Sequence, residues 1–208
     1  MYQPPHFRDD DRAAQHALIR AHPLGLLVSA GPGGLVANPV PFLIDGAGPH
    51  GTLRAHLARA NPQWQDLAAT DECLVVFQGP QAYVTPAWYA SKREHGRVVP
   101  TWNYVVVQAR GRPRVIEDEQ WLRRQIADLT AAREAARAEP WAVDDAPEKF
   151  VAAQVRALVG LEIPITRIEG KWKMSQNRPE ADRRGVVDGL CADGAGAVAA
   201  LVAERSPA

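Results

Sequence analysis

Six short runs of strand-forming residues, separated by turn signals, follow one another between residues 24 and 116. The first run closes in the turn sequence Gly-Pro-Gly-Gly, and a glycine-rich turn over residues 45–51 follows the second. Pro39 and Pro41 interrupt the second run, which should therefore form an edge strand or a bulged strand. The runs cover residues 24–30, 35–44, 52–57, 72–78, 81–85 and 104–116. Short strands at this spacing predict an antiparallel sheet that closes into a small barrel.

Helical signals surround the strand region, and after Asp118 apolar residues recur at the spacing of one helix face. The expected helices cover residues 12–21, 118–139, 147–158 and 179–190, and residues 159–168 return to the sheet. A chain of 208 residues without an internal linker predicts one domain over residues 1–190, with helical additions. Residues 191–208 are expected to form a frayed helix or a disordered tail.

The charge balance argues against a surface that binds nucleic acid. The chain has 24 basic and 24 acidic residues, whereas phosphate neutralisation usually requires a basic surplus. The first residues do not resemble a signal peptide, and no apolar run is long enough to span a bilayer. Cys73 and Cys191 fit no metal-binding or redox spacing, so no metal site is expected and a reducing cytoplasm fits.

The segment Arg-Ala-Asn-Pro-Gln-Trp, which begins at Arg59, marks the start of a helix. Asparagine is a preferred N-cap and proline is favoured at the first helical position, so the helix should begin at Asn61. Free amides at a helix start attract anions, and Arg59 adds a guanidinium that matches phosphate. His56 lies three residues upstream, at the end of the preceding strand. The segment predicts a cradle for a phosphomonoester; the alternative is an ordinary strand-to-helix turn with a surface arginine.

Two aromatic segments flank a basic loop over residues 91–97. One is Tyr-Val-Thr-Pro-Ala-Trp-Tyr from Tyr83, and the other is Val-Pro-Thr-Trp-Asn-Tyr from Val99. A flat ligand would fit against such side chains while Thr85 offers a hydroxyl group, although aromatic residues more often build a core or a dimer contact. The loop between the two segments is expected to be mobile.

Residues 169–177, Glu-Gly-Lys-Trp-Lys-Met-Ser-Gln-Asn, place cations and amide donors directly after a strand. Donors led by a glycine suit a phosphate group or the carbonyl groups of a ring. The alternative is a charged turn that caps the last helix.

In their order along the chain, these segments resemble the motif blocks of one family. The blocks are ARANPQW, GPQAYVTPAWY, VPTWNY and EGKWKMSQNRPEADR, and the opening MYQPPHF fits as well. They resemble the PaiB-type FMN-binding proteins, which are described as negative transcriptional regulators. The similarity runs from Met1 to about Leu190.

The resemblance implies a mainly β fold with accessory helices, an FMN-binding split β-barrel of the pyridoxamine-phosphate-oxidase-like type. Such barrels are normally homodimers that hold FMN at the subunit interface. By analogy, the phosphate would lie at Arg59, Asn61 and Gln63, and no catalytic residue is assigned. The full set of positions expected to bind the cofactor is His56, Arg59, Asn61, Gln63, Thr85, Trp88, Trp102, Lys173, Gln176 and Asn177.

Three functions are compatible with this sequence. The first is a flavin-binding regulator that acts indirectly, through a partner or a small molecule, because the neutral charge and the lack of a helix-turn-helix pair make direct DNA binding doubtful. The second is a flavin-dependent oxidoreductase of the flavin reductase, oxidase or haem-degrading type, and fold alone does not choose among these. The third is a dimeric barrel whose aromatic residues only build the interface.

Overall fold

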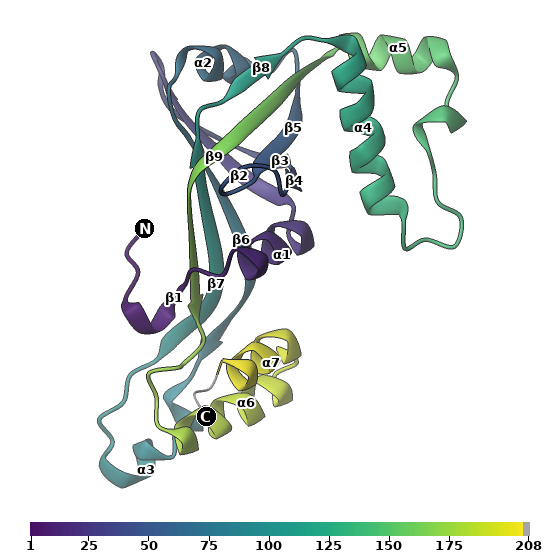
Figure 1. Ribbon diagram of the computed structural model, residues 1–208. Helices are drawn as coiled ribbons and strands as arrows, with labels where there is room; N and C mark the ends of the chain where they lie inside the picture. The colour runs from purple at the N-terminus through teal and green to yellow at the C-terminus, as the bar shows by residue number, and fades with distance from the viewer. Residues whose placement is uncertain (206–208) are drawn as a thin grey trace. The chain divides into compact units, whose positions relative to one another are not determined.

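The computed structural model of the protein describes residues 1–205, which form a mainly antiparallel sheet of nine strands and seven α-helices (Figure 1). The strand order is β3-β2-β6-β7-β9-β5-β4, and β1 and β8 each pair with β9. The strands are β1 (Arg8–Asp9), β2 (Leu24–Gly31), β3 (Gly34–Pro41), β4 (Leu43–Asp45), β5 (Thr52–Ala58), β6 (Cys73–Val84), β7 (Thr101–Gly111), β8 (Arg114–Ile116) and β9 (Leu158–Lys173). The helices are α1 (Arg12–Ala21), α2 (Gln63–Ala69), α3 (Ser91–His95), α4 (Glu119–Glu134), α5 (Glu148–Arg156), α6 (Glu180–Ala192) and α7 (Gly196–Glu204), with short 3-10 turns η1 (Pro5–Phe7), η2 (Pro86–Trp88) and η3 (Val143–Asp145). The expected mainly β fold with accessory helices is confirmed.

The chain divides into two compact units, each assembled from distant segments. Unit 1 comprises Met1–Gln15, Gln78–Val107 and the residues from Glu169 onward, and unit 2 comprises His16–Phe77 and Gln108–Ile168. Strands β6, β7 and β9 contribute residues to both units. Neighbouring residues of one strand can therefore belong to different units, and the expected domain over residues 1–190 stays a prediction.

The core of unit 2 lies under β2, β5 and β6. Leu53, Ala55 and Leu57 of β5 are buried while the residues between them are partly exposed, which is the alternation of a half-buried strand. The rings of Phe42 and Phe77 meet edge to face with their centroids 5.7 Å apart. Strand β3 lies at one edge of the sheet, as its two prolines predict.

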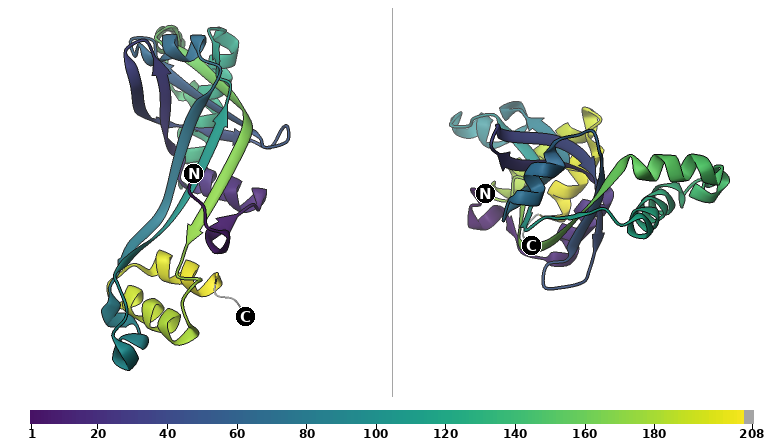
Figure 2. Two further views of the ribbon diagram at one scale, coloured as in Figure 1. Left: turned by 90° about the vertical axis from the view of Figure 1, so that its left-hand side faces the viewer. Right: turned by 90° about the horizontal axis from the view of Figure 1, so that it is seen from above.

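Helix α4 packs on β5 and β9 in unit 2, next to α5 (Figure 2). The ring of Trp121 lies over Gly160, because a Cβ on that glycine would be 2.5 Å from the ring carbon Cζ3. Gly160 is the β9 partner of His56. Arg54 lies two residues before His56, on the same face of β5, and its Nη1 donates to Oε1 of Gln125 at 3.2 Å. His56 therefore lies beneath α4, where neither its Nδ1 nor the Nε2 of Gln125 has a hydrogen-bond partner within the described residues.

The C-terminal helices of unit 1 are packed. Three side chains of α7 are buried, and α7 contacts α6. Nη1 of Arg205 donates to Oδ2 of Asp9, and the Arg205 guanidinium lies 5.0 Å from the ring centroid of Trp172. In the segment 191–208, expected to form a frayed helix or a disordered tail, residues 191–192 end α6 and residues 196–204 form α7. Residues 206–208 of that expectation lie outside the described residues.

Trp88 of η2 packs on α6 at two glycines. A Cβ on Gly185 would lie 2.0 Å from the backbone oxygen of Trp88, and a Cβ on Gly189 would lie 2.3 Å from carbon atoms of its indole ring. The spacing of four residues puts both glycines on one face of α6. This face accepts the indole because it carries no side chains.

Two local signals in the sequence have a different outcome in the structure. Strand β6 continues through Gly79 and Pro80, where a turn is expected, because proline is compatible with an extended backbone that does not need its N–H group. Residues 91–97, expected to be a mobile loop, contain the short helix α3. The backbone N and Oγ of buried Ser91 donate to the Asp182 carboxylate at 2.9 and 2.7 Å.

We predict that Gly185→Ala and Gly189→Ala each lower the free energy of unfolding by ~1–3 kcal/mol, the usual cost of overpacking. Chemical denaturation of each variant measures this change. Gly196→Ala is the matched control, because no atom lies within 4 Å of a Cβ at that position. Equal unfolding midpoints for all three variants would show that the Trp88 contact does not constrain α6.

A second prediction concerns His56, whose pKa is lowered by burial. Its folded-state pKa lies below the unfolded value of about 6.5. The stability that depends on neutral His56 is therefore complete above about pH 6.5 and is lost as pH falls toward the folded-state pKa. Measured between about pH 7.5 and 5.5, the loss of unfolding free energy should be smaller in His56→Asn than in the wild type. His95→Asn, at an exposed position, should behave as the wild type; identical pH profiles for all three proteins would contradict the prediction.

Candidate functional site

Three cations gather in unit 1 on β9 and the turn that follows it. Lys171 and Lys173 are separated by two residues on one strand and therefore lie on the same face. Their Nζ atoms lie 5.3 and 5.9 Å from the ring centroid of Tyr104, and the Arg178 guanidinium lies 4.6 Å from the ring centroid of Tyr89. Within residues 1–205, none of the three cations forms an ion pair with a carboxylate. This group is called the cation cluster.

Lys173 and Arg178 are partly buried and Lys171 is buried, so all three members of the cation cluster are shielded from solvent to some degree. Nζ of Lys173 donates to Oγ1 of Thr101 and to the backbone oxygen of Trp102, the latter at 2.7 Å. Burial lowers the pKa of Lys173, and the neighbouring charges of Lys171 and Arg178 lower it further. An anion bound here would offset this repulsion, so the electrostatics of the cluster favour an anionic ligand.

An aromatic surface adjoins Lys173. The Trp102 side chain is 48% exposed and Tyr83 is 49% exposed, with their ring centroids 6.0 Å apart. Nε1 of Trp102 donates to Oε1 of Gln81 at 2.9 Å, which fixes the orientation of the indole. Exposed rings held in this way offer a platform for a flat ligand.

Thr85 and Trp88 build the turn η2. Oγ1 of Thr85 accepts a hydrogen bond from the backbone N of Ala87 at 3.2 Å and caps the turn. Trp88 contributes its ring to the α6 contact described above. Both residues have structural roles in unit 1, and a contact with a flavin remains a prediction for them.

Gln176 and Asn177 lie in the turn after β9. The side chain of Gln176 accepts from the backbone N of Met174 at 2.7 Å and donates to the backbone oxygen of Trp172 at 2.6 Å. Ser175, directly before Gln176, has a left-handed φ of 62°. Gln176 thus holds a strained turn in place, while Asn177 is exposed.

Arg59 in unit 2 is anchored by three groups. Its Nη1 donates to the Glu117 carboxylate at 2.6 Å, Nε donates to the oxygen of Arg156 at 3.2 Å, and Nη2 donates to the oxygen of Leu158 at 3.1 Å. The Arg59 side chain is 40% exposed. A phosphate contact would therefore compete with Glu117 for this guanidinium.

Asn61 and Gln63 organise the start of α2. The helix begins at Gln63 and not at Asn61, and Oδ1 of Asn61 accepts from the backbone N of Gln63 at 3.0 Å. The Gln63 side chain is 1% exposed; its Nε2 donates to the oxygen of Leu27 and its Oε1 accepts from Asn38. These bonds tie α2 to the β2–β3 hairpin, so the structure gives Gln63 a buried structural role.

His56 is separated from this group by its place beneath α4. Within unit 2, Arg59, Asn61 and Gln63 lie at one strand-to-helix turn, and the Nε1 of Trp64 also donates to the oxygen of Arg59 at 3.0 Å. In unit 1, Lys173 and Trp102 are joined directly by a hydrogen bond. Of the residues expected to bind the cofactor, the structure thus brings together Arg59, Asn61 and Gln63 in unit 2, and separately Lys173 and Trp102 in unit 1.

An exposed apolar face extends across β2, β3 and β6 in unit 2. Residues that pair across strands share one face of a sheet, as do alternate residues along a strand. Leu24, Leu26 and Leu35 on this face are 64%, 41% and 80% exposed. The apolar sheet face consists of Leu24, Leu26, Val28, Ala30, Leu35, Ala37, Pro39, Pro41, Leu74 and Val76. It carries no charged residue, and contiguous apolar surface of this kind marks an interaction site.

The donor set of unit 1 fits FMN. A flavin mononucleotide combines a flat ring system with a dianionic phosphate, and the unit offers exposed rings beside cations that have no carboxylate partner. Thr101, Tyr104, Lys171 and Arg178 belong to this arrangement and are absent from the residues expected from the sequence. The spacing of two between Lys171 and Lys173, and between Trp102 and Tyr104, is the signal that could have found them.

Comparison with known proteins agrees with these features. Residues 1–167 match the family described as "Putative FMN-binding domain". The chain is 30% identical over 190 residues to the protease synthase and sporulation protein PAI 2 of Bacillus subtilis, covering 91% of this chain and 89% of that protein. It is 36% identical over 227 residues to an uncharacterised protein of Emericella nidulans, covering 90% of each.

Solved structures support the fold. The FAD and heme binding protein of Mycobacterium smegmatis has a TM-score of 0.59 at 20% identity, with 80% of this chain and 73% of that chain covered. The flavocytochrome Anf3 of Azotobacter vinelandii also has a TM-score of 0.59, at 16% identity, with coverage of 80% and 69%. The family match, the PAI 2 relative and the shared fold lead to one conclusion: this chain belongs to the PaiB-type family of FMN-binding split-barrel proteins.

Proposed function

We propose that this protein is an FMN-binding homodimer that acts in regulation through its flavin or a small-molecule ligand and does not read DNA sequence itself. The observation that carries the proposal is the cation cluster beside the exposed rings of Tyr83 and Trp102. FMN, when bound, supplies reversible redox chemistry. The chain's own residues supply charge, stacking surface and orientation.

Lys173 and Trp102 are assigned to FMN in this proposal. A fixed positive charge suits either the phosphate or the pyrimidine side of the flavin ring, where negative charge develops on reduction. Trp102 would stack against the ring. The expectation from the sequence that Arg59 and Asn61 of unit 2 bind a phosphate is kept as a separate prediction, with the condition that Arg59 exchanges Glu117 for the phosphate.

The regulatory part of the proposal rests on the relative. The Bacillus subtilis protein carries the name protease synthase and sporulation protein PAI 2. The flavoprotein neighbours are compatible with the alternative, a flavin-dependent oxidoreductase, and no feature of residues 1–205 favours it. The regulator is therefore the function put forward.

Direct reading of DNA is argued against by the C-terminal helices. Helices α6 and α7 are joined by residues 193–195, a connection length typical of helix-turn-helix pairs, which the sequence did not lead us to expect. Base readout requires side chains with donors or acceptors. Helix α7 has the sequence Gly-Ala-Val-Ala-Ala-Leu-Val-Ala-Glu, and its sole polar side chain is a carboxylate at the C-terminal end. The pair therefore lacks the chemistry of a recognition helix.

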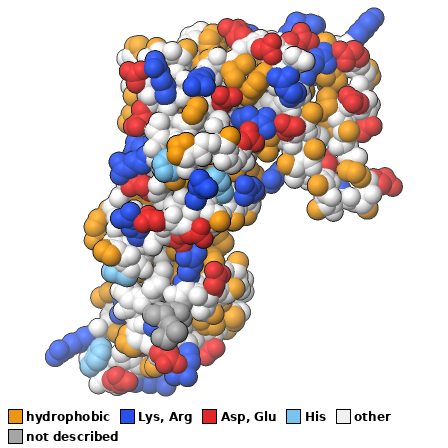
Figure 3. Space-filling model, viewed as in Figure 1, with side chains coloured by type: hydrophobic (Ala, Val, Ile, Leu, Met, Phe, Trp, Pro, Cys, Tyr) orange, Lys and Arg blue, Asp and Glu red, His pale blue; other side chains and the backbone are white. Residues whose placement is uncertain are grey.

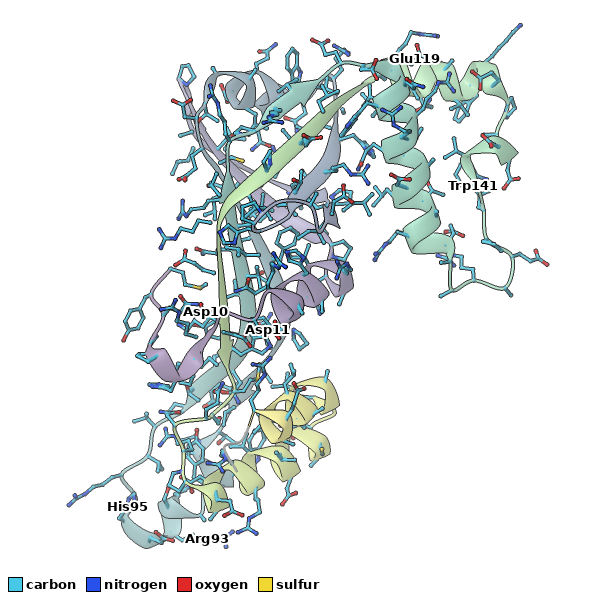
Figure 4. The ribbon with its side chains drawn as sticks, in the orientation of Figure 1. Asp10, Asp11, Arg93, His95, Glu119 and Trp141 are labelled. Carbon is cyan, nitrogen blue, oxygen red and sulfur yellow. The ribbon has the colours of Figure 1, made fainter. Side chains whose placement is uncertain are left out.

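A basic tip is present elsewhere in unit 1. Lys92, Arg93, His95 and Arg97 are exposed around α3. Figure 4 labels Arg93 and His95 among them, and Figure 3 shows basic side chains at this end of unit 1. A single short cluster of this kind gives weak, salt-dependent contacts to phosphate and carries no sequence information. It does not change the proposal.

Homodimerisation is supported by the apolar sheet face. Its leucines would lose contact with water if a second copy covered them, which is the main favourable contribution to association.

No helix in residues 1–205 is long and apolar enough to cross a membrane. A cytoplasmic location is part of this proposal and fits the free thiols of Cys73 and Cys191.

Lys173→Ala should weaken FMN binding by about 10–100-fold, the usual loss for a hydrogen bond to a charged group. Titration with FMN and with riboflavin separates two roles. If Lys173 contacts the phosphate, its loss weakens the binding of FMN alone. If Lys173 contacts the ring, its loss weakens the binding of both FMN and riboflavin. Arg59→Ala should weaken FMN alone, and Glu117→Gln should tighten FMN because it releases Arg59.

Lys92→Ala provides the matched control, since it removes an exposed cation of the same unit. It should bind both ligands as the wild type does. If Lys173→Ala and Arg59→Ala also bind both ligands with wild-type affinity, the assignment of these residues to FMN is wrong.

Leu24→Asp should raise the dimer dissociation constant by about tenfold or more, because it places a charge in the apolar sheet face. Sedimentation equilibrium measures this change. Phe150→Asp is the control, since Phe150 is 56% exposed on α5 and lies outside that face. A wild-type protein that remains a monomer of 22.7 kDa, or equal dissociation constants for both variants, would refute the proposed interface.

A further inference from the structure

A hollow of about 470 Å³ lies in unit 2 between α4 and the segment that follows it. Pockets for small ligands usually have volumes of about 300–1,000 Å³. The segment, residues 135–144, runs back alongside α4, and Figure 4 labels Trp141 on it. The hollow is lined by Ala127, Thr130, Ala131, Glu134, Ala135, Pro140, Trp141, Ala142, Val143 and Asp144. None of the residues assigned to FMN is among them.

One wall of the hollow is a face of α4 with small side chains. Ala127, Ala131 and Ala135 recur at a spacing of four and therefore lie one above the other. Their methyl groups leave room beside the helix that larger side chains would fill. The opposite face of α4 carries Leu122, which packs with α5. Ala127, Ala131 and Ala135, called the alanine wall, therefore do not belong to the core that Leu122 forms with Val151 and Val155 of α5.

Trp141 forms the facing wall, with Pro140 and Val143 beside it. The Trp141 side chain is 49% exposed, so its ring is available to a ligand. Its backbone N donates to Oε2 of Glu134 at 3.2 Å, which ties the segment to the end of α4. The turn η3 adds a reciprocal pair of hydrogen bonds between Ala142 and Asp145, at 2.8 and 3.0 Å. The wall is therefore held in position before any ligand binds.

The charge of the hollow has one sign. Glu134 and Asp144 line it, and no lysine, arginine or histidine does. Glu134 is paired with Arg137, whose Nε donates to Oε1 at 2.9 Å. Asp144 is exposed and forms no ion pair with a described residue. An uncompensated carboxylate beside an indole ring is the combination that attracts an organic cation.

We propose that this hollow binds a small organic ammonium ion with an apolar body. The ammonium group would lie over the ring of Trp141 and near the carboxylate of Asp144, and the apolar body would lie along the alanine wall. The inference is independent of FMN binding, since its residues belong to a different part of the chain. The protein would then have two ligand sites, one in the hollow that prefers a cation and one at the cation cluster that prefers an anion.

Calorimetric titration of the whole protein with 2-phenylethylammonium and with 2-phenylethanol tests the proposal. The two probes share their apolar body and differ in charge. The ammonium ion should bind at least about tenfold more tightly than the alcohol, and Trp141→Ala and Asp144→Asn should each weaken it by about fivefold. Phe150→Ala and Glu139→Gln are the matched controls, because they remove an exposed ring and a carboxylate from the same region without lining the hollow.

FMN titration and thermal unfolding of each variant check that the fold is intact. Both should match the wild type, because neither Trp141 nor Asp144 is buried. Equal affinity for the two probes would overturn the charge preference. Wild-type affinity in Trp141→Ala would overturn the location. A loss in Glu139→Gln as large as that in Asp144→Asn would show a general charge effect and would also overturn the proposed site.

Discussion

The backbone pairing of β9 is the constraint on which the other features depend. This strand of sixteen residues pairs with β1, β5 and β8. In unit 2 its Gly160 admits the ring of Trp121, which seats α4 over His56. In unit 1 its alternation places Lys171 and Lys173 on one face. A shift of one residue in the register would turn both lysines away from Tyr104 and remove the cluster.

In the proposed function, the cation cluster supplies the positive charge that suits a flavin nucleotide. Like charges that are partly buried repel one another, and Lys173 is held by hydrogen bonds to Thr101 and Trp102 without a carboxylate partner. Elsewhere in the chain, arginines such as Arg54 and Arg59 pair with acids. Within the described part of the chain, the cation cluster in unit 1 has no such partner, and an anionic aromatic ligand would complete it.

The sequence predicts local elements better than the partners of side chains. The prolines of β3 correctly predicted an edge strand, and α1 begins and ends at the expected residues, whereas α4 ends at Glu134, five residues before the expected end. The partner of Arg59, by contrast, is 58 residues away, and the burial of Gln63 depends on a hairpin that precedes it. The packing of Trp88 on α6 could not be expected from local sequence either, because Gly185 and Gly189 lie about a hundred residues later. Such long-range contacts leave no signal in local spacing.

Sedimentation velocity of the protein with FMN, recorded in both the protein band and the visible flavin band, tests the central claim most directly. The account predicts that flavin absorbance sediments with a species of about twice 22.7 kDa, with about one FMN per chain. A protein that sediments as a monomer, with the flavin left behind as a free small molecule, would contradict it.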